Sequence, residues 1–168
     1  LLLIRICMSE TSQVAPDFRL TGTDGEQGRE YTLSTFADGR PTMLVFYIYD
    51  YSPVCTTQMC EVNDMEFLTF NEEVAVLGIS TDGPYSHQQF IADNDISYPL
   101  LTDDEKEVYE QYGMLDRTEE GKRQAKRGIV LLDSERTVRY RWEADDNWDP
   151  WETRPLSEAN AILNDLTE

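Results

Sequence analysis

The sequence predicts an α/β domain in which a central mixed β-sheet is flanked by helices. Two runs, residues 43–49 and 74–80, are apolar on both faces, as strands in the middle of a covered sheet are. Each run is followed by turn residues and a helix-like segment, which is the order of a βαβ unit. With 168 residues, 40% of them hydrophobic, the chain suits one compact core and is too short for two ordinary domains.

The elements are expected in a simple order along the chain. A loop-like start leads to the first strand, and Ser52 is a suitable N-cap for a helix with Pro53 at its first position. A second helix is expected over residues 84–94, opened by Pro84. The remaining predictions are a strand at 98–101, a helix at 103–112 closed by Gly113, a strand at 128–132, its hairpin partner at 138–142 and a last helix at 157–166.

We interpret residues 1–7 as an upstream extension or an edge strand and residues 8–168 as a single domain. The opening apolar segment is too short for a secretory signal and lies directly before Met8. No run approaches the roughly 18 apolar residues of a membrane span. Three cysteines without such a signal indicate a reducing, cytoplasmic compartment.

The charge balance is strongly acidic, with 33 acidic against 14 basic residues and a formal net charge of -19. This balance argues against nucleic acid and anionic membranes as partners. The acidic residues are spread between apolar segments, which indicates a folded chain rather than a disordered one. A folded chain tolerates such repulsion between its own charges best in high salt, because the Debye length shrinks to about 3 Å at 1 M. We therefore expect a halophilic source, the alternative being an ordinary acidic protein.

Cys55 and Cys60 lie where the first strand gives way to the first helix. A helix start presents free N–H groups and the positive end of the peptide dipole, so Cys55 should ionise more readily than a free thiol. In a regular helix, residues five apart have Cα atoms about 8 to 9 Å apart. A disulfide does not bridge more than about 7 Å without backbone movement. The pair therefore suits a switching disulfide that forms after local unwinding. The alternative for Cys55 is a small buried hydrophobic residue.

The stretch FYIYDYSPVCTTQMC at residues 46–60 resembles the active-site segment of peroxiredoxins, especially the bacterioferritin comigratory protein branch. The similarity runs from about Val14 into the C-terminal helix. Its other anchors are Ala15-Pro16-Asp17-Phe18 with Leu20, Ser80-Thr81-Asp82, Ser86-His87 with Phe90, residues 98–103, Tyr112-Gly113, and Arg127 ahead of Asp133.

The resemblance implies a thioredoxin-like fold and an antioxidant enzyme that reduces hydrogen peroxide and organic hydroperoxides without metal or bound cofactor. It also implies a thioredoxin-like reductant and a monomer or homodimer. The family pattern is proline, three residues, Thr or Ser, two residues, Cys. Ser52 and Cys55 fit it, but Ile48 stands at the proline position. Ile48 can keep the apolar shielding without the fixed φ of proline, so we expect a looser pocket with activity retained.

The resemblance also implies the site roles. Cys55 is the expected nucleophile and becomes a sulfenic acid, and Cys60 is the expected resolving thiol. The Ser52 hydroxyl could hold the peroxide or only cap the helix. Arg127 would stabilise the thiolate and the leaving oxygen, although an arginine before a strand is usually a surface residue. A helical Cys60 could instead simply face the core.

Other functions remain open on the residues alone. A thiol–disulfide oxidoreductase would share the fold but normally uses Cys-x-x-Cys, whereas four residues separate Cys55 from Cys60. Ile48 at the proline position motivates a non-catalytic thioredoxin-fold binding or holdase protein. A zinc site built from the cysteines and His87 is not expected, because Cys7 lies outside the domain and His87 should be solvated. Three tryptophans are expected to cap the core and are assigned no function: Trp142, Trp148 and Trp151.

Overall fold

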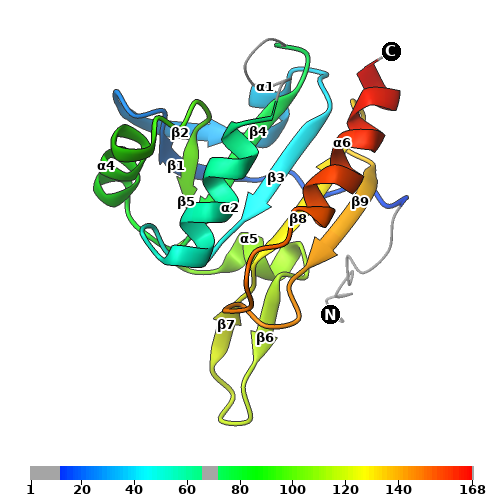
Figure 1. Ribbon diagram of the computed structural model, residues 1–168. Coiled ribbons are helices and arrows are strands. Elements are labelled where there is room, and N and C mark those ends of the chain that lie inside the picture. Colours follow the sequence, from blue (N-terminus) through cyan, green and yellow to red (C-terminus); the bar gives the residue numbers. More distant parts are fainter. Residues whose placement is uncertain (1–11, 66–71, 168) are drawn as a thin grey trace, which may run out of the picture.

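The computed structural model describes residues 12–65 and 72–167 and shows a β-sheet with helices on both faces (Figure 1). The strands of this sheet are β1 (Arg19–Thr23), β2 (Gly28–Thr32), β3 (Thr42–Phe46), β4 (Ala75–Ser80), β5 (Leu100–Thr102), β8 (Gly128–Leu132) and β9 (Val138–Glu143). A separate hairpin is formed by β6 (Leu115–Arg117) and β7 (Arg123–Ala125). The helices are α1 (Leu33–Ala37), α2 (Pro53–Asn63), α4 (Pro84–Asn94), α5 (Glu107–Gln111) and α6 (Arg154–Thr167).

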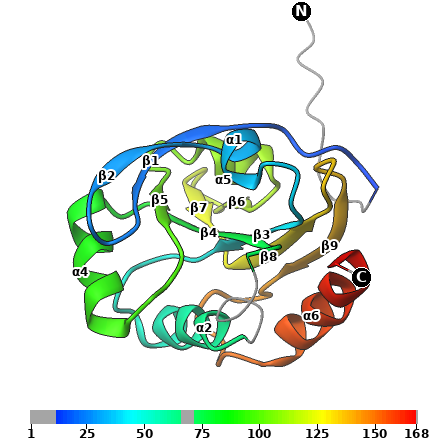
Figure 2. The ribbon, with the colours of Figure 1, turned by 90° about the horizontal axis from the view of Figure 1, so that it is seen from above.

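The sheet is mixed, as the sequence predicted. Its strand order is β2-β1-β5-β4-β3-β8-β9, with β3, β4 and β5 parallel and the other neighbours antiparallel. Viewed from above, α1 and α5 lie on one side of the sheet and α2 and α6 on the other (Figure 2). Helix α4 packs against β1 and β5. The predicted sheet flanked by helices is confirmed.

The centre of the sheet is the hydrophobic core. Every residue of β3, β4 and β8 is buried, because these strands are covered on both faces. Strand β3 ends at Phe46, earlier than the predicted residue 49, although Tyr47 and Ile48 are also buried. An apolar run reports burial and does not distinguish a paired strand from a buried loop. The residues after β3 therefore enter the core as a loop.

Several boundaries differ from the sequence prediction. Helix α4 and strand β8 match it, whereas the loop-like start contains the β1–β2 hairpin and α1. Helix α5 begins at Glu107 rather than residue 103, because both carboxylate oxygens of Asp103 accept main-chain N–H groups of the following turn. Helix α6 begins at Arg154 and includes Pro155, whose missing N–H costs no hydrogen bond in a first turn.

Two predictions concern the chain ends and the membrane. The extension or edge strand predicted for residues 1–7, with Cys7, lies outside the described residues. Across residues 12–65 and 72–167, the helices are all too short or too polar to cross a bilayer.

Candidate active site

The loop between β3 and α2 brings the reactive segment to the edge of the core. Ser52 is the N-cap of α2, with extended φ and ψ of -65° and 139°, and Pro53 occupies the first turn. The Ser52 hydroxyl oxygen accepts the main-chain N–H of Cys55 at 3.2 Å. The predicted cap is confirmed, and the Ser52 hydroxyl proton is left to be donated elsewhere.

Cys55 lies in the first turn of α2 with no exposed surface. Its sulfur accepts a hydrogen bond from the main-chain N–H of Ile48, with a nitrogen–sulfur distance of 3.4 Å. The Ile48 side chain is also buried, so the apolar shielding expected of it is present. Ile48 and Cys55 both pack into the core, and the looser pocket that we expected stays a prediction.

Arg127 lies just before β8 and is buried, with 1% of its surface exposed. It is therefore not a surface residue, although an arginine before a strand usually is. Its Nε donates to the Asn147 carbonyl oxygen at 2.7 Å, and its Nη2 donates to the Asp149 carbonyl oxygen at 3.0 Å. Burial lowers the pKa of Arg127, and the charges of Cys55, Asp149 and Asp146 oppose that shift. The guanidinium therefore lies within the electrostatic reach of the Cys55 sulfur.

The loop that follows β9 holds Arg127 in place. The side-chain oxygen of Asn147 accepts the main-chain N–H of Arg127 at 3.0 Å, and the amide nitrogen donates to the Ala125 carbonyl at 2.8 Å. The Trp148 ring stacks on Tyr49 of the reactive loop, with centroids 6.3 Å apart. No sequence signal identified Asn147, because a single amide in an acidic, aromatic segment is usually a surface residue.

The three tryptophans divide between two roles. Trp142 and Trp151 pack edge to face, with centroids 5.7 Å apart, and both lie against the core as expected. Trp148 is 52% exposed and does not cap the core. Its contact with Tyr49 instead joins the loop of Arg127 to the loop of Cys55.

Gln58 is a second residue that the sequence reading missed. It lies three residues after Cys55 on α2, with no exposed surface, and its Nε2 donates to the Phe46 carbonyl oxygen at 3.3 Å. Its Oε1 and the Nη1 of Arg127 are buried, and neither has a hydrogen-bond partner in the described part of the chain. Gln58 therefore keeps a free acceptor and Arg127 a free donor inside the described part of the molecule.

Cys60 lies on the same helix as Cys55, and both are free thiols. The Cys60 thiol is half-buried against α4 and donates to the side-chain oxygen of Asn94 at 3.6 Å. Burial raises the pKa of Cys60, and the charge of Asp64 raises it further. Because α2 is helical from Pro53 to Asn63, the two sulfurs can bond only after its first turns unwind.

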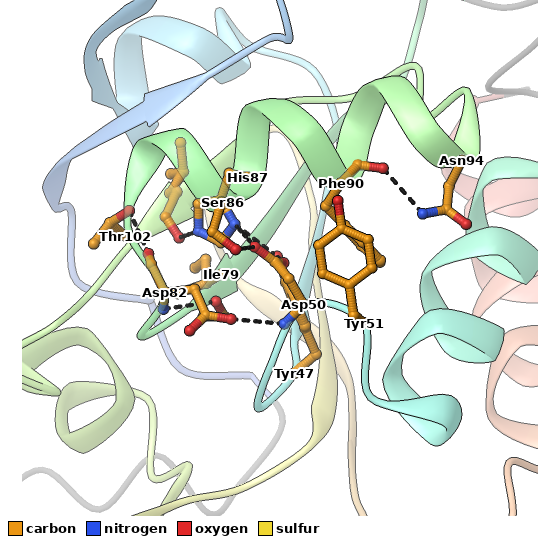
Figure 3. Close-up of polar contacts among 12 residues, drawn as sticks. Tyr47, Asp50, Tyr51, Ile79, Asp82, Ser86, His87, Phe90, Asn94 and Thr102 are labelled. Carbon is orange, nitrogen blue, oxygen red and sulfur yellow. Dashed lines mark hydrogen bonds and ion pairs between the residues drawn. The ribbon is translucent and has the colours of Figure 1, made fainter.

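His87 is buried, not solvated as the sequence reading expected (Figure 3). Its Nδ1 lies 2.8 Å from a carboxylate oxygen of Asp50, and its Nε2 lies 3.2 Å from the Leu101 carbonyl oxygen. Both ring nitrogens therefore lie within hydrogen-bond distance of an oxygen atom. The side chains of His87 and Asp50 are 0% and 1% exposed, so this contact is shielded from solvent.

The contact between His87 and Asp50 connects helix α4 to the reactive loop. The Asp50 carboxylate also accepts the hydroxyl groups of Tyr47 at 2.7 Å and Ser86 at 2.8 Å. The next residue, Tyr51, has a left-handed φ of 66°, which is unusual for an aromatic residue, and its hydroxyl donates to Asp93. Figure 3 shows how the loop residues lie between α4 and the end of the sheet.

In the described part of the chain, no three His, Cys, Asp or Glu side chains come together as a metal site. Of the predicted site residues, the structure brings Ser52, Cys55 and Arg127 into one region. Cys60 lies further along α2 and faces α4.

Known proteins resemble this chain in sequence and structure. Residues 11–141 match the AhpC/TSA family. The putative peroxiredoxin bcp of Coxiella burnetii is 34% identical over 79% of this chain and 87% of its own length. Peroxiredoxin Bcp of Escherichia coli is 34% identical over 62% of this chain and 65% of its own length. The crystal structure of peroxidoxin BcpB from Mycobacterium tuberculosis is 26% identical, with a TM-score of 0.76 over 94% of this chain and 97% of that one.

Proposed function

Because the chain belongs to the AhpC/TSA family of peroxiredoxins and has their thioredoxin-like fold, we propose that Cys55 reduces hydroperoxides through a sulfenic acid. The observation that carries the proposal is a thiol at a helix start within the electrostatic reach of a buried guanidinium, that of Arg127. Both features favour the thiolate over the thiol.

The reaction needs no group beyond the chain and the peroxide. The Cys55 thiolate attacks one peroxide oxygen, so that a sulfur–oxygen bond forms while the oxygen–oxygen bond breaks. The other oxygen leaves as hydroxide or alkoxide and takes a proton from solvent. The sulfur is oxidised to a sulfenic acid, and the peroxide is reduced to water or an alcohol.

Three polar groups suit this transfer. The Ser52 hydroxyl can donate to a peroxide oxygen while its oxygen continues to accept the Cys55 N–H. The free Nη1 of Arg127 can donate to the leaving oxygen, where negative charge develops. The free Oε1 of Gln58 can accept a hydrogen bond from the peroxide O–H. Since Cys55 has no exposed surface, a peroxide reaches it only when the surrounding side chains move.

Cys60 would complete the cycle as the resolving thiol. It attacks the sulfenic acid, a disulfide forms and water leaves, after the first turns of α2 have unwound. A thioredoxin-like dithiol then supplies two electrons and restores both thiols. We expect the protein to act as a monomer or homodimer in the cytoplasm.

The test is peroxide consumption by the reduced protein, with its mass measured after one equivalent of hydrogen peroxide. The parent chain should lose two hydrogens and contain a Cys55–Cys60 disulfide. A Cys55→Ser variant should not consume peroxide. The matched control, Cys60→Ser, should react once and stop at a sulfenic acid that a dimedone-type reagent traps.

Two results would contradict parts of the proposal. Peroxide consumption by Cys55→Ser at the parent rate would refute the nucleophile. A sulfenic or overoxidised product in the parent chain, with Cys60 intact, would refute only the resolving role.

A further inference from the structure

The hydrogen bond from the Ile48 N–H to the Cys55 sulfur is one that a proline at position 48 could not make. Its nitrogen–sulfur distance is 3.4 Å, and both residues are buried. Proline has no main-chain N–H, so the substitution that puts Ile48 at the pattern's proline position adds a donor beside the reactive sulfur.

We propose that the Ile48 main-chain N–H stabilises the Cys55 thiolate, which makes Ile48 a positioning residue for the peroxidase reaction. This inference rests on the proposed function of Cys55. A thiolate accepts a hydrogen bond far more strongly than a thiol does, so a donor fixed at the sulfur favours the ionised form. The same bond fixes the direction in which the sulfur points.

Burial makes this donor important. Cys55 has no exposed surface, so water does not solvate its charge in this conformation, and the protein must supply the compensating groups. The N–H of Cys55 itself is already bonded to Ser52. Among the described residues, the charge of Arg127 before β8 interacts with Cys55. Burial raises the pKa of Tyr109 of α5, so that ring stays neutral near Cys55. Among the described residues, it is the Ile48 N–H that donates a hydrogen bond to the Cys55 sulfur.

A purely structural role is the competing explanation. A buried main-chain N–H needs an acceptor, and the sulfur could serve only to satisfy Ile48. In that case, removal of the N–H would leave the ionisation of Cys55 unchanged. The two roles are therefore separated by a direct measurement of the thiolate.

The experiment measures the ultraviolet absorbance of the thiolate against pH in chains that lack Cys7 and Cys60. Subtraction of the matching Cys55→Ser chain removes the tyrosine signal. The key variant replaces Ile48 by its α-hydroxy acid, which turns the amide into an ester and deletes the N–H without changing the side chain. Ile48→Pro deletes the same N–H with a ring, and Ile48→Val keeps it as the matched control.

The ester also weakens the Tyr47 carbonyl as an acceptor for the Tyr109 hydroxyl, so Tyr109→Phe controls for that loss. We expect the ester and Ile48→Pro to move the midpoint of thiolate formation upward by about one pH unit, a tenfold change in ionisation. Ile48→Val and Tyr109→Phe should stay near the parent midpoint. Below that midpoint, the ester should also react with hydrogen peroxide about tenfold more slowly.

An ester midpoint equal to that of the parent overturns the proposal. A shift in Ile48→Pro without one in the ester also overturns it, because the ring would then be the cause. The proposed peroxidase function fails separately. In that case the parent chain would not consume peroxide, while the absorbance titration would still report whether the N–H stabilises the thiolate.

Discussion

Arg127 is held by main-chain carbonyl oxygens, and this determines what its charge can do. Its recorded acceptors in the described part of the chain are the carbonyls of Asp146, Asn147 and Asp149. Carbonyl dipoles orient a guanidinium but do not neutralise its charge, whereas a paired carboxylate would neutralise it. The positive charge of Arg127 is therefore left to act on Cys55.

We predict that Arg127→Lys lowers the rate constant for reaction with hydrogen peroxide by about a hundredfold. Lysine keeps the charge but cannot donate to three carbonyls from one planar group, so its position would no longer be fixed. Stopped-flow mixing of the reduced protein with peroxide gives the rate. Arg123→Lys is the control, because Arg123 binds carbonyls and Glu110 at the base of the β6–β7 hairpin. A loss smaller than about threefold would show that Arg127 has only a structural role.

The pKa of Cys60 should determine how the rate of disulfide formation depends on pH. Burial and Asp64 raise its pKa, so the helical thiol stays protonated at neutral pH, and its reactive thiolate is populated only as the pH rises. If Cys60 ionises before α2 unwinds, the rate of disulfide formation will keep rising with pH beyond the pH range in which an ordinary thiol ionises. Rapid quenching after one equivalent of peroxide measures that rate.

The control for this prediction is Asp64→Asn, which removes one of the two causes of the raised pKa. It should move the pH profile towards lower pH by a fraction of a unit, because Asp64 is exposed and solvent screens its charge. If the rate of disulfide formation depends on pH in the same way in Asp64→Asn and in the parent chain, Cys60 ionises only after α2 unwinds.

The sequence predicted the site residues that carry a local pattern. Ser52 and Pro53 identify a helix start by themselves, and Cys55 follows within one turn. Asn147 and Gln58 could not be found this way, because their roles depend on partners that are distant in the sequence or on burial. The resemblance, not the local pattern, singled out Arg127.

At the scale of elements, the pair formed by Asp50 and His87 joins the reactive loop to α4. Removal of one member would leave the other buried without its hydrogen-bond partner, which typically costs about 1 to 3 kcal/mol. We predict this loss for both Asp50→Asn and His87→Gln in urea unfolding at neutral pH. The double variant should lose much less than the sum of the two.

The exposed pair Arg154–Glu158 on α6 is the matched control, with a nitrogen–oxygen distance of 2.9 Å. Its coupling in the same double-mutant cycle should be much smaller, because solvent screens it. Additive losses at Asp50 and His87 would show that the two residues do not stabilise the fold through their mutual contact.

The fully buried strands were the easiest elements to predict. The strands β3, β4 and β8 were found because all of their residues are buried, which makes their sequences continuous apolar runs. The strands β1, β2, β6 and β7 were missed, because most of their residues are exposed or partly exposed and show no apolar period. The left-handed Tyr51 was also beyond prediction, because local sequence favours Gly or Asn at such a φ.

At the scale of the whole molecule, the net charge of -19 should make stability depend on salt. Raising sodium chloride from about 0.1 M to about 1 M shortens the Debye length from about 10 Å to about 3 Å and weakens the repulsion between carboxylates. We predict that the thermal unfolding midpoint rises over this range. A gain of about 1 kcal/mol corresponds to about 2 to 4 °C for a chain of this size.

A variant with less negative charge separates this effect from a general effect of salt. Glu26→Gln combined with Glu119→Gln removes two exposed charges, and its midpoint should rise less steeply with salt. A midpoint that stays constant or falls as salt increases would contradict the proposal that the protein is adapted to a salt-rich environment.

The β6–β7 hairpin stands away from the rest of the molecule and is fixed at its base (Figure 1). Lys106 donates to the Arg123 carbonyl at 2.9 Å, and the Arg123 side chain binds Glu110 at 3.1 Å. The tip at Glu119 and Glu120 faces solvent, and exposed tips tolerate added sequence. An affinity epitope spliced between these two glutamates would therefore give a handle for immobilising the folded enzyme on a sensor, with both chain ends left free.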